Sequence, residues 1–271
     1  FAERSTLSNH RHHLIRDFMQ HDIAIVICTV CRESLLRAIG SIYEQTYAGP
    51  IQILIGVDID AFENEAKLQQ VIFENCPAHI QVNWINMGYS TSKRHGGVHS
   101  CFYGGSLRTS LSFLANSQYI MYLDDDDWLA PNHCTDILNA IQNKSWAFSY
   151  SIYADGNEGI GICTDEIESV GVGEGIYKDR FGGFVRPSGL LLDKNQLSHL
   201  LHLWSSSPYP SGDGEDRLIF EHLRHLDHGC TGSPSVYYAL DPKDGAHEIR
   251  MNFIRKQNPS FQINPKKESV R

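Results

Sequence analysis

The sequence predicts an α/β fold with a mostly parallel central sheet, helices on both faces and a smaller mixed β extension. Apolar segments of strand length at 23–27, 51–57 and 80–85 alternate with helical periodicity at 35–43 and 63–75. The continuous run Ile23–Ile27 is typical of a parallel strand that is buried on both faces. Because strand–helix repeats favour right-handed crossovers, we expect these strands to share one sheet.

The pattern resumes after a glycine-rich stretch at 87–107, which we expect to be a functional loop. A helix is predicted over 106–116 and a fourth buried strand over Tyr119–Leu123, and Pro131 begins the next helix. After Lys144 the segments become shorter, aromatic and glycine-rich. The predicted strands are 146–153, 160–164, 169–177, 189–192 and 236–238, and the predicted helices are 194–204 and 216–226.

Composition places the chain among globular proteins and argues against several functional classes. Of 271 residues, 41% are hydrophobic and 20% are charged, which leaves ample material for a core. The net charge of -9 argues against a general phosphate-backbone binder, so no nucleic-acid partner is expected. Seven scattered cysteines indicate reduced thiols in the cytoplasm. The longest apolar run has strand length, so no transmembrane span is expected, and a targeting segment before Phe1 stays open.

Four consecutive aspartates, Asp124–Asp127, follow the predicted strand 119–123. Ligands of parallel α/β sheets bind outside the carboxyl ends of strands, so these carboxylates should face a crevice. Neighbouring carboxylates raise one another's pKa unless they share a proton or a cation. A hard divalent cation such as Mg²⁺ or Mn²⁺ would relieve the repulsion and also hold phosphate oxygens. The alternative is a solvated acidic turn before the helix at Pro131.

Residues 25–47 resemble the opening strand, turn and helix of the family 2 inverting glycosyltransferases of the GT-A fold. That family has a Pro-Thr-x-Asn-Arg turn and a Ser-x-x-x-Gln helix end. The chain departs from this pattern at Cys28 and Cys31, which stand where Pro and Asn are usual. The residues that match are Thr29, Arg32, Ser41 and Gln45.

The resemblance continues in order along the chain. Ile53–Asp58 is similar to the second strand of the family, and Arg108 matches the arginine of a later helix, with Thr109 where Asn is usual. Residues 122–127 fall where the family has its DxD motif. The match is dense from about Asp22 to Cys134.

The resemblance implies a GT-A (nucleotide-diphospho-sugar transferase) fold and a role for individual residues. Thr29 and Asp58 would address the nucleotide base, and Arg108 the diphosphate or the base pocket. Asp126 would hold the metal, and Asp124 would lie on the ribose or the metal. His247, after Asp244, is a second expected metal ligand, with a solvated loop histidine as the alternative. The full expected cofactor-binding set is Thr29, Arg32, Asp58, Arg108, Asp124 and Asp125.

Residues 212–218 resemble the Glu-Asp pair that begins a helix in this family, which implies that Asp216 is the general base. A carboxylate near a helix N-terminus and beside Glu215 is suited to pKa tuning. An ordinary acidic helix N-terminus is the alternative, and sequence spacing does not separate the two.

The resemblance therefore implies an inverting glycosyltransferase that depends on Mn²⁺ or Mg²⁺. Its donor would be a nucleoside diphosphate sugar, with uridine as the default base. The acceptor would be a glycan, a glycolipid or another hydroxyl compound, with cell-surface glycan assembly as the expected pathway. Two rival classes stay open. One is a non-catalytic nucleotide-sugar or carbohydrate-binding protein of the same fold, and the other is a sugar-nucleotide pyrophosphorylase, whose early glycine-rich loop with Arg is not seen here.

The expected organisation has four parts. Residues 23–143 would bind the donor and 144–249 the acceptor, between an N-terminal arm at 1–22 and a basic tail at 250–271. The tail carries Arg250, Arg255 and Lys256, which would cover the diphosphate as a lid or simply be solvated. We expect a cytoplasmic protein, with contact between this tail and an anionic inner membrane face left open.

Overall fold

The computed structural model describes residues 21–102 and 104–261. Most of the expected N-terminal arm therefore lies outside the described residues, and its last two residues, His21 and Asp22, belong to the first strand. Residues 262–271 of the expected basic tail also lie outside them.

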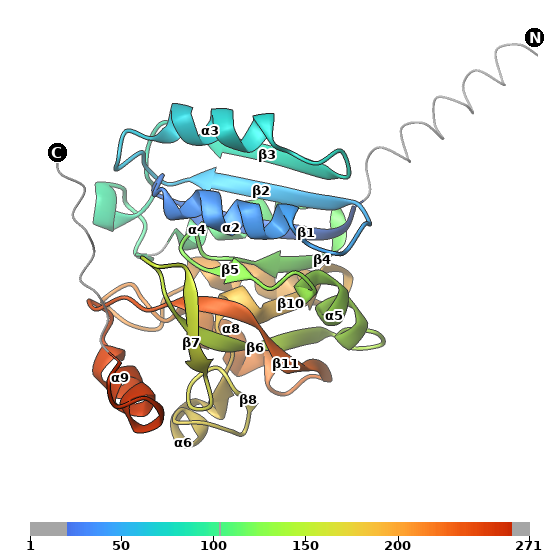
Figure 1. Cartoon of the computed structure of the whole chain (residues 1–271). Helices are drawn as coiled ribbons and strands as arrows, with labels where there is room; N and C mark the ends of the chain where they lie inside the picture. The colour runs from blue at the N-terminus through green and yellow to red at the C-terminus, as the bar shows by residue number, and fades with distance from the viewer. Residues whose placement is uncertain (1–20, 103, 262–271) are drawn as a thin grey trace, which may run out of the picture.

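Within the described residues, a nine-stranded sheet has the order β3-β2-β1-β4-β10-β6-β11-β5, and β7 pairs with β6 (Figure 1). Its first four strands run parallel to one another, as the sequence predicts. They are β1 (His21–Thr29), β2 (Ile51–Val57), β3 (Ile80–Asn86) and β4 (Ser117–Tyr122).

The second half of the chain adds mixed strands to the same sheet. β10 is antiparallel to β4 and β6, β11 is parallel to β6, and β7 and β5 are antiparallel to their partners. The sheet is therefore continuous across the expected boundary at residue 143. These strands are β5 (Trp128–Leu129), β6 (Trp146–Asp155), β7 (Ile160–Thr164), β10 (Leu190–Asp193) and β11 (His228–Ala239).

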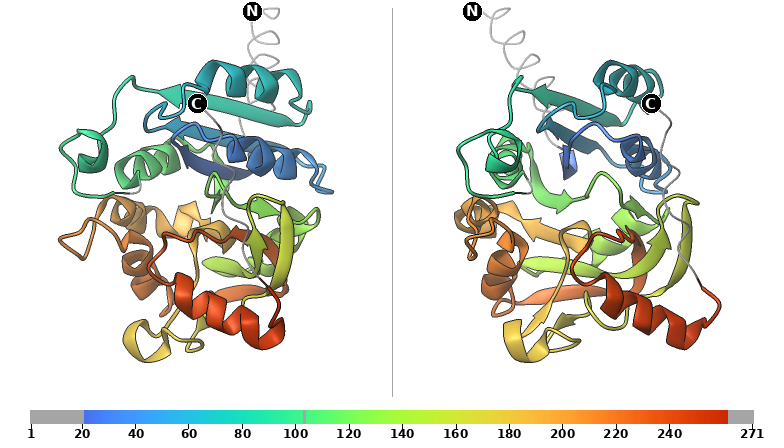
Figure 2. Two further views of the ribbon diagram at one scale, coloured as in Figure 1. Left: turned by 60° about the vertical axis from the view of Figure 1, so that its left-hand side comes forward. Right: turned by 90° about the vertical axis from the view of Figure 1, so that its left-hand side faces the viewer.

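Helices cover both faces of the sheet, as Figure 2 shows. Alternate residues of β1 point to opposite faces of the sheet. Ile23, Ile25 and Ile27 therefore belong to one core, and Ala24 and Val26 belong to the other. The first core includes residues of α2 (Ser34–Tyr43), α3 (Glu65–Glu74) and α5 (His133–Ala140). The second includes residues of α4 (Gly105–Leu114), α7 (Lys194–Leu197), η3 (Ser198–Ser205) and α8 (Glu215–Leu223).

Several predicted elements differ from the structure. The strand predicted at 169–177 is reduced to β8 (Gly171–Val172), because Gly173 and Gly175, with positive φ angles of 76° and 74°, interrupt the extended backbone after it. The helix predicted at 194–204 is α7 followed by the 3₁₀ helix η3. The short elements η1 (Lys93–His95), α6 (Lys178–Phe181), β9 (Gly183–Phe184) and η2 (Pro187–Gly189) were not predicted.

A further helix, α9 (His247–Gln257), occupies part of the expected basic tail. Its residues Met251 and Ile254 are buried in a small core with Tyr153 and Leu240. Tertiary packing therefore stabilises a helix whose own sequence is strongly polar. None of the helices in the described ranges has the length and apolar character needed to cross a membrane.

Candidate active site

The expected site residues gather at the carboxyl edge of the parallel strands. Thr29 ends β1, Asp58 directly follows β2, and the aspartate turn begins one residue beyond the end of β4, after Leu123. The register pairs β1 with both β2 and β4, so these three positions lie side by side although they are far apart in the sequence. This edge lies at the arrowhead of β2 in Figure 1.

Asp125 and Asp127 are buried, Asp124 and Asp126 are partly exposed, and arginines supply much of the neutralising charge. Thr29 Oγ1 donates a 2.7 Å hydrogen bond to Asp125, which is 5% exposed. Arg32 Nη1 lies 3.0 Å from Asp125 Oδ1 and 3.1 Å from Asp126 Oδ2. Arg108 Nη2 donates a 2.8 Å hydrogen bond to Asp124. The turn is therefore not merely a solvated acidic turn.

Asp127, the fourth aspartate, has a structural role that the sequence did not indicate. It accepts hydrogen bonds from Ser188 Oγ at 2.6 Å and from the backbone N–H of Ala239 at 2.9 Å. Ser188 Oγ in turn accepts the backbone N–H of Asp124 at 3.2 Å. Burial raises the pKa of Asp127 well above its usual range. Asp127 thus fastens the aspartate turn to η2 and to the end of β11.

The glycine-rich stretch packs onto Asp58 and contributes two polar residues that were not predicted for the site. Ser90 Oγ donates a 2.6 Å hydrogen bond to Asp58 Oδ1, and His95 Nδ1 donates one of 2.7 Å to Oδ2. Asp58 is 6% exposed as a result. The only sequence signal for this contact is the loop's own glycine-rich composition with Ser and His.

Glu215 and Asp216 begin α8, behind Gly214 with its positive φ of 86°. Glu215 is 4% exposed, and Arg108 Nη1 lies 3.8 Å from its Oε1. Burial, together with the charge of Asp216, raises the pKa of Glu215 to about 7. Burial also raises the pKa of Asp216, whose Oδ1 accepts the N–H of Arg217 at 2.8 Å.

Arg108 therefore joins the two halves of the site. It is 5% exposed, its guanidinium lies 4.9 Å from the ring centre of the buried Trp204, and it contacts both Asp124 and Glu215. The charges of Arg108 and Asp124 also reach Asp216 and shift its pKa in opposite directions. The predicted base thus lies within electrostatic range of the aspartate turn.

His247 is the first residue of α9, and its Nδ1 is buried without a hydrogen-bond partner. Among the described residues, no hydrogen bond or ion pair joins it to Asp126. The described ranges contain no preformed group of three or more His, Cys, Asp or Glu side chains that would hold a metal ion. The pairing of Asp126 and His247 on a metal therefore stays a prediction.

Arg250 is neither a lid residue nor a solvated charge, which corrects both readings of this residue from the sequence. It is 5% exposed, and it pairs with Glu168 at 3.1 Å and with Asp244 at 3.0 Å. Arg186 pairs with the same Glu168 at 3.2 Å and with Asp165 at 2.8 Å. This buried network fixes α9 to the body of the protein. The other two tail residues, Arg255 and Lys256, are exposed on α9.

The donor chemistry of the aspartate turn fits a divalent cation. The side chains of Asp124 and Asp126 are 37% and 36% exposed, so their oxygens are accessible beside the buried Asp125. Asp126 Oδ1 has no hydrogen bond to another described side chain. Burial and the charge of Asp125 raise the pKa of Asp126 to about 7, against the opposing effect of Arg32. Accessible carboxylate oxygens of this kind are the ligands that Mg²⁺ and Mn²⁺ prefer.

Comparison with known proteins reveals similarity of fold. No protein-family model and no curated protein matches the sequence. The structure of S. aureus TarS 1-349 in complex with UDP-GlcNAc matches with a TM-score of 0.58 and 10% identity, over 89% of this chain and 68% of that chain. Mannosyltransferase PcManGT from Pyrobaculum calidifontis in complex with GDP-Man and Mn²⁺ matches with a TM-score of 0.54 and 10% identity, over 92% and 67%.

A further TarS structure matches with a TM-score of 0.56 and 10% identity over 89% of this chain, which spans only 40% of that chain. These likenesses confirm the predicted fold class, an α/β fold of GT-A type whose curled central sheet is flanked by helices. At this level of identity they are statements about fold.

Proposed function

We propose that this protein is a metal-dependent inverting glycosyltransferase of the family 2 type, which moves a sugar from a nucleoside diphosphate sugar to a hydroxyl acceptor. One observation carries the proposal. Asp124, Arg108 and the Glu215–Asp216 pair, from three separate segments, meet at the carboxyl edge of a sheet whose fold is also that of a mannosyltransferase in complex with GDP-Man and Mn²⁺.

On the donor side, Asp58 and Thr29 would face the nucleotide base, with Ser90 and His95 holding the Asp58 carboxylate in place. Arg108 and Arg32 would turn from the aspartates toward the diphosphate, because a phosphate offers the same kind of charge-assisted hydrogen bonds as a carboxylate. Uridine is the proposed base.

Asp126 would hold the cation, with Asp124 and Asp125 on either side and His247 as a further ligand. When bound, Mn²⁺ or Mg²⁺ would neutralise the charge that develops on the departing nucleoside diphosphate. The net charge of -9 makes such a cation important, because the protein as a whole repels phosphate.

Asp216 would accept the proton of the acceptor hydroxyl as that oxygen attacks the anomeric carbon, in a single displacement that inverts the configuration. Its raised pKa makes it a better base near neutral pH than an ordinary aspartate. Glu215, buried against Arg108, would fix the start of α8 and so the position of Asp216.

We also propose a cytoplasmic location and an acceptor of the glycan or glycolipid class. The seven cysteines form no disulfide, which suits a reducing compartment.

A thermal-shift experiment tests the proposal directly. UDP-GlcNAc, GDP-Man and UDP should each be added with and without Mn²⁺, because a ligand that binds only the folded state stabilises it, by about 2.7 kcal/mol at a hundredfold excess over Kd. We expect at least one donor to raise the Tm only with Mn²⁺, and Asp126→Ala to abolish that rise. Asp136→Ala, on α5, is the matched control.

Release of nucleoside diphosphate from the stabilising donor, measured in the same samples, separates an enzyme from a binding protein. A protein that binds the donor and releases no nucleotide with any hydroxyl acceptor belongs to the non-catalytic class. A Tm rise that is equal in Asp126→Ala would remove the metal role from this residue.

A further inference from the structure

A pocket lies at the amino-terminal ends of β1 and β4, at the end of these strands opposite the aspartate turn. β1 runs from His21 at the pocket to Thr29 at the candidate active site, a distance of roughly 25 Å for a strand of this length. The pocket has a volume of about 390 Å³, near the lower end of the range for small-molecule sites. It is therefore separate from the site described above.

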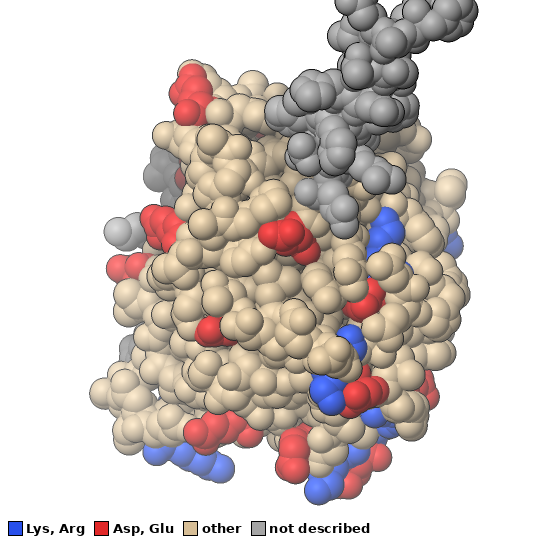
Figure 3. All heavy atoms as spheres, turned by 90° about the vertical axis from the view of Figure 1, so that its right-hand side faces the viewer, with Lys and Arg blue, Asp and Glu red and all other residues tan. Residues whose placement is uncertain are grey.

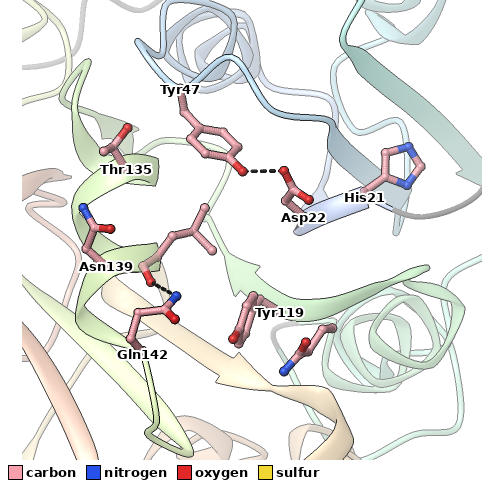
Figure 4. A pocket seen from close by; sticks show the side chains of 9 residues that line it. His21, Asp22, Tyr47, Tyr119, Thr135, Asn139 and Gln142 are labelled. Carbon is pink, nitrogen blue, oxygen red and sulfur yellow. Dashed lines mark hydrogen bonds between the residues drawn. The ribbon is translucent and has the colours of Figure 1, made fainter. Parts of the chain in front are cut away.

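Figure 4 shows how the walls of this pocket are arranged. Tyr47 and Asp22 form one side, Tyr119 lies across from them, and α5 presents polar side chains on the remaining side. They are Thr135 and Asn139 on α5 and Gln142 in the turn that follows it.

The Tyr47–Asp22 wall is fixed by its surroundings. The hydroxyl of Tyr47 donates a hydrogen bond to Asp22. A Cβ at Gly49 would lie 2.4 Å from both the Asp22 carboxylate and the Tyr47 hydroxyl, so the glycine leaves the space that this pair occupies. Burial and the bond to Asp22 raise the pKa of Tyr47, so its phenol stays neutral and continues to donate. The single carboxylate of the pocket, that of Asp22, therefore already accepts a hydrogen bond from Tyr47.

Three other polar side chains of the pocket are not engaged by side-chain hydrogen bonds within the described part of the chain. The hydroxyls of Tyr119 and Thr135 and the amide of Asn139 make no side-chain hydrogen bond to another described residue, although Tyr119 and Thr135 are both partly buried. Hydroxyl and amide groups each donate and accept hydrogen bonds. They therefore match a ligand that carries both kinds of group.

The charges of the lining side chains disfavour anionic ligands. None of the nine lining residues is Lys or Arg, and the carboxylate of Asp22 would repel an anion. Uncharged surface predominates on the face of the molecule at this end of the strands, as Figure 3 shows. Nucleoside diphosphates and other phosphates are thus poorly suited to this pocket, whereas a neutral hydroxylated ligand is well suited.

We propose that this pocket binds a neutral saccharide of one or two rings. The hydroxyls of the sugar would exchange hydrogen bonds with Thr135, Asn139 and Tyr119, and its apolar ring faces would contact the partly exposed tyrosine rings. The proposal does not depend on the activity of the other site, because it rests on a different set of residues.

The test uses the full chain and titrates glucose, galactose, mannose, N-acetylglucosamine, maltose and cellobiose, with binding followed by saturation-transfer NMR and calorimetry. We expect at least one of them to bind, and Asn139→Ala and Thr135→Val each to weaken that binding about tenfold. Asn139 is exposed on a helix, where alanine is well tolerated, so the first variant should fold normally. Asp136→Ala on the same helix and Asp126→Ala at the other site should leave binding unchanged.

Three results would overturn the proposal. They are failure of every saccharide to bind, binding that Asp126→Ala or excess UDP abolishes, and binding that neither Asn139→Ala nor Thr135→Val weakens. If the parent protein binds a saccharide but neither UDP-GlcNAc nor GDP-Man, the result would count against the proposed function alone.

Discussion

The guanidinium of Arg108 donates a 2.8 Å hydrogen bond to the carboxylate of Asp124, joining α4 to the turn that follows β4. The other side of the same guanidinium faces the buried Glu215 at 3.8 Å. One buried cation thus lies between two carboxylates from distant segments.

Arg108→Met should lower the free energy of unfolding by about 3 kcal/mol, because it leaves Glu215 buried without its cation. Urea denaturation measures the change. Lys178→Met, at an exposed position, should stay within about 0.5 kcal/mol of the parent protein. If both variants unfold alike, the Arg108 contacts contribute little to stability.

Asp216→Asn should retain the donor-dependent rise in Tm and lose transfer by about 10²–10⁴-fold, because the amide has nearly the same shape but accepts no proton. The measurements are thermal shift and release of nucleoside diphosphate in the presence of acceptor. Asp213→Asn, three residues earlier, is the matched control and should remain active. An active Asp216→Asn protein would assign the base to another residue.

Glu215 should make the protein less stable as pH rises from about 4.5 to 7. Its pKa is about 7 in the folded state against an ordinary value of 4.5, so the folded state binds more protons than the unfolded state in this window. The free energy of unfolding contributed by Glu215 is therefore highest below pH 4.5 and falls toward pH 7. Other groups titrate here as well, so the measured quantity is the difference between the parent protein and Glu215→Gln.

Urea unfolding at pH 5, 6 and 7 would measure that difference. Glu215→Gln should gain stability relative to the parent protein as pH rises. A difference that is constant with pH would show that Glu215 has the same pKa in both states.

Arg250→Met should destabilise the protein by about 3–5 kcal/mol, because Glu168 and Asp244 lose a buried partner. Lys256→Met, on the exposed side of α9, should change stability by less than about 0.5 kcal/mol. Thermal and urea unfolding measure both. A stable Arg250→Met protein with weakened donor binding would restore the lid interpretation that the structure rejects.

Local pattern was sufficient for the strongly periodic part of the fold. Ile51–Val57 was predicted with the bounds that it has, because six apolar or small residues out of seven, between turn signals, leave few alternatives. The predicted strand at 169–177 was too long, because Gly173 and Gly175 have positive φ angles that end it after Val172, and a backbone angle is not visible in composition. α9 was missed because its polar sequence becomes helical only when Met251 and Ile254 are packed against the sheet.

The candidate site shows the same division. Asp58 and the aspartate turn could be placed at one edge of the sheet from strand order alone, whereas Ser90 and His95 could not, since a loop carries no periodicity that fixes where it packs. The sequence predicted that the aspartates would need a cation and suggested a metal. The structure adds that Arg32 and Arg108 already provide part of that charge.

The sequence was sufficient to predict the strands and α-helices from β1 to β4, the two buried faces of β1 and the position of the acidic turn, because each depends on neighbours a few residues apart. The tertiary structure decided which charges meet. Arg32 lies 93 residues from Asp125, and Arg250 lies 82 from Glu168. Such pairs form only when the folded sheet brings distant segments together. Burial then makes each pair important for stability, because a charge that is removed from water needs a partner within the protein.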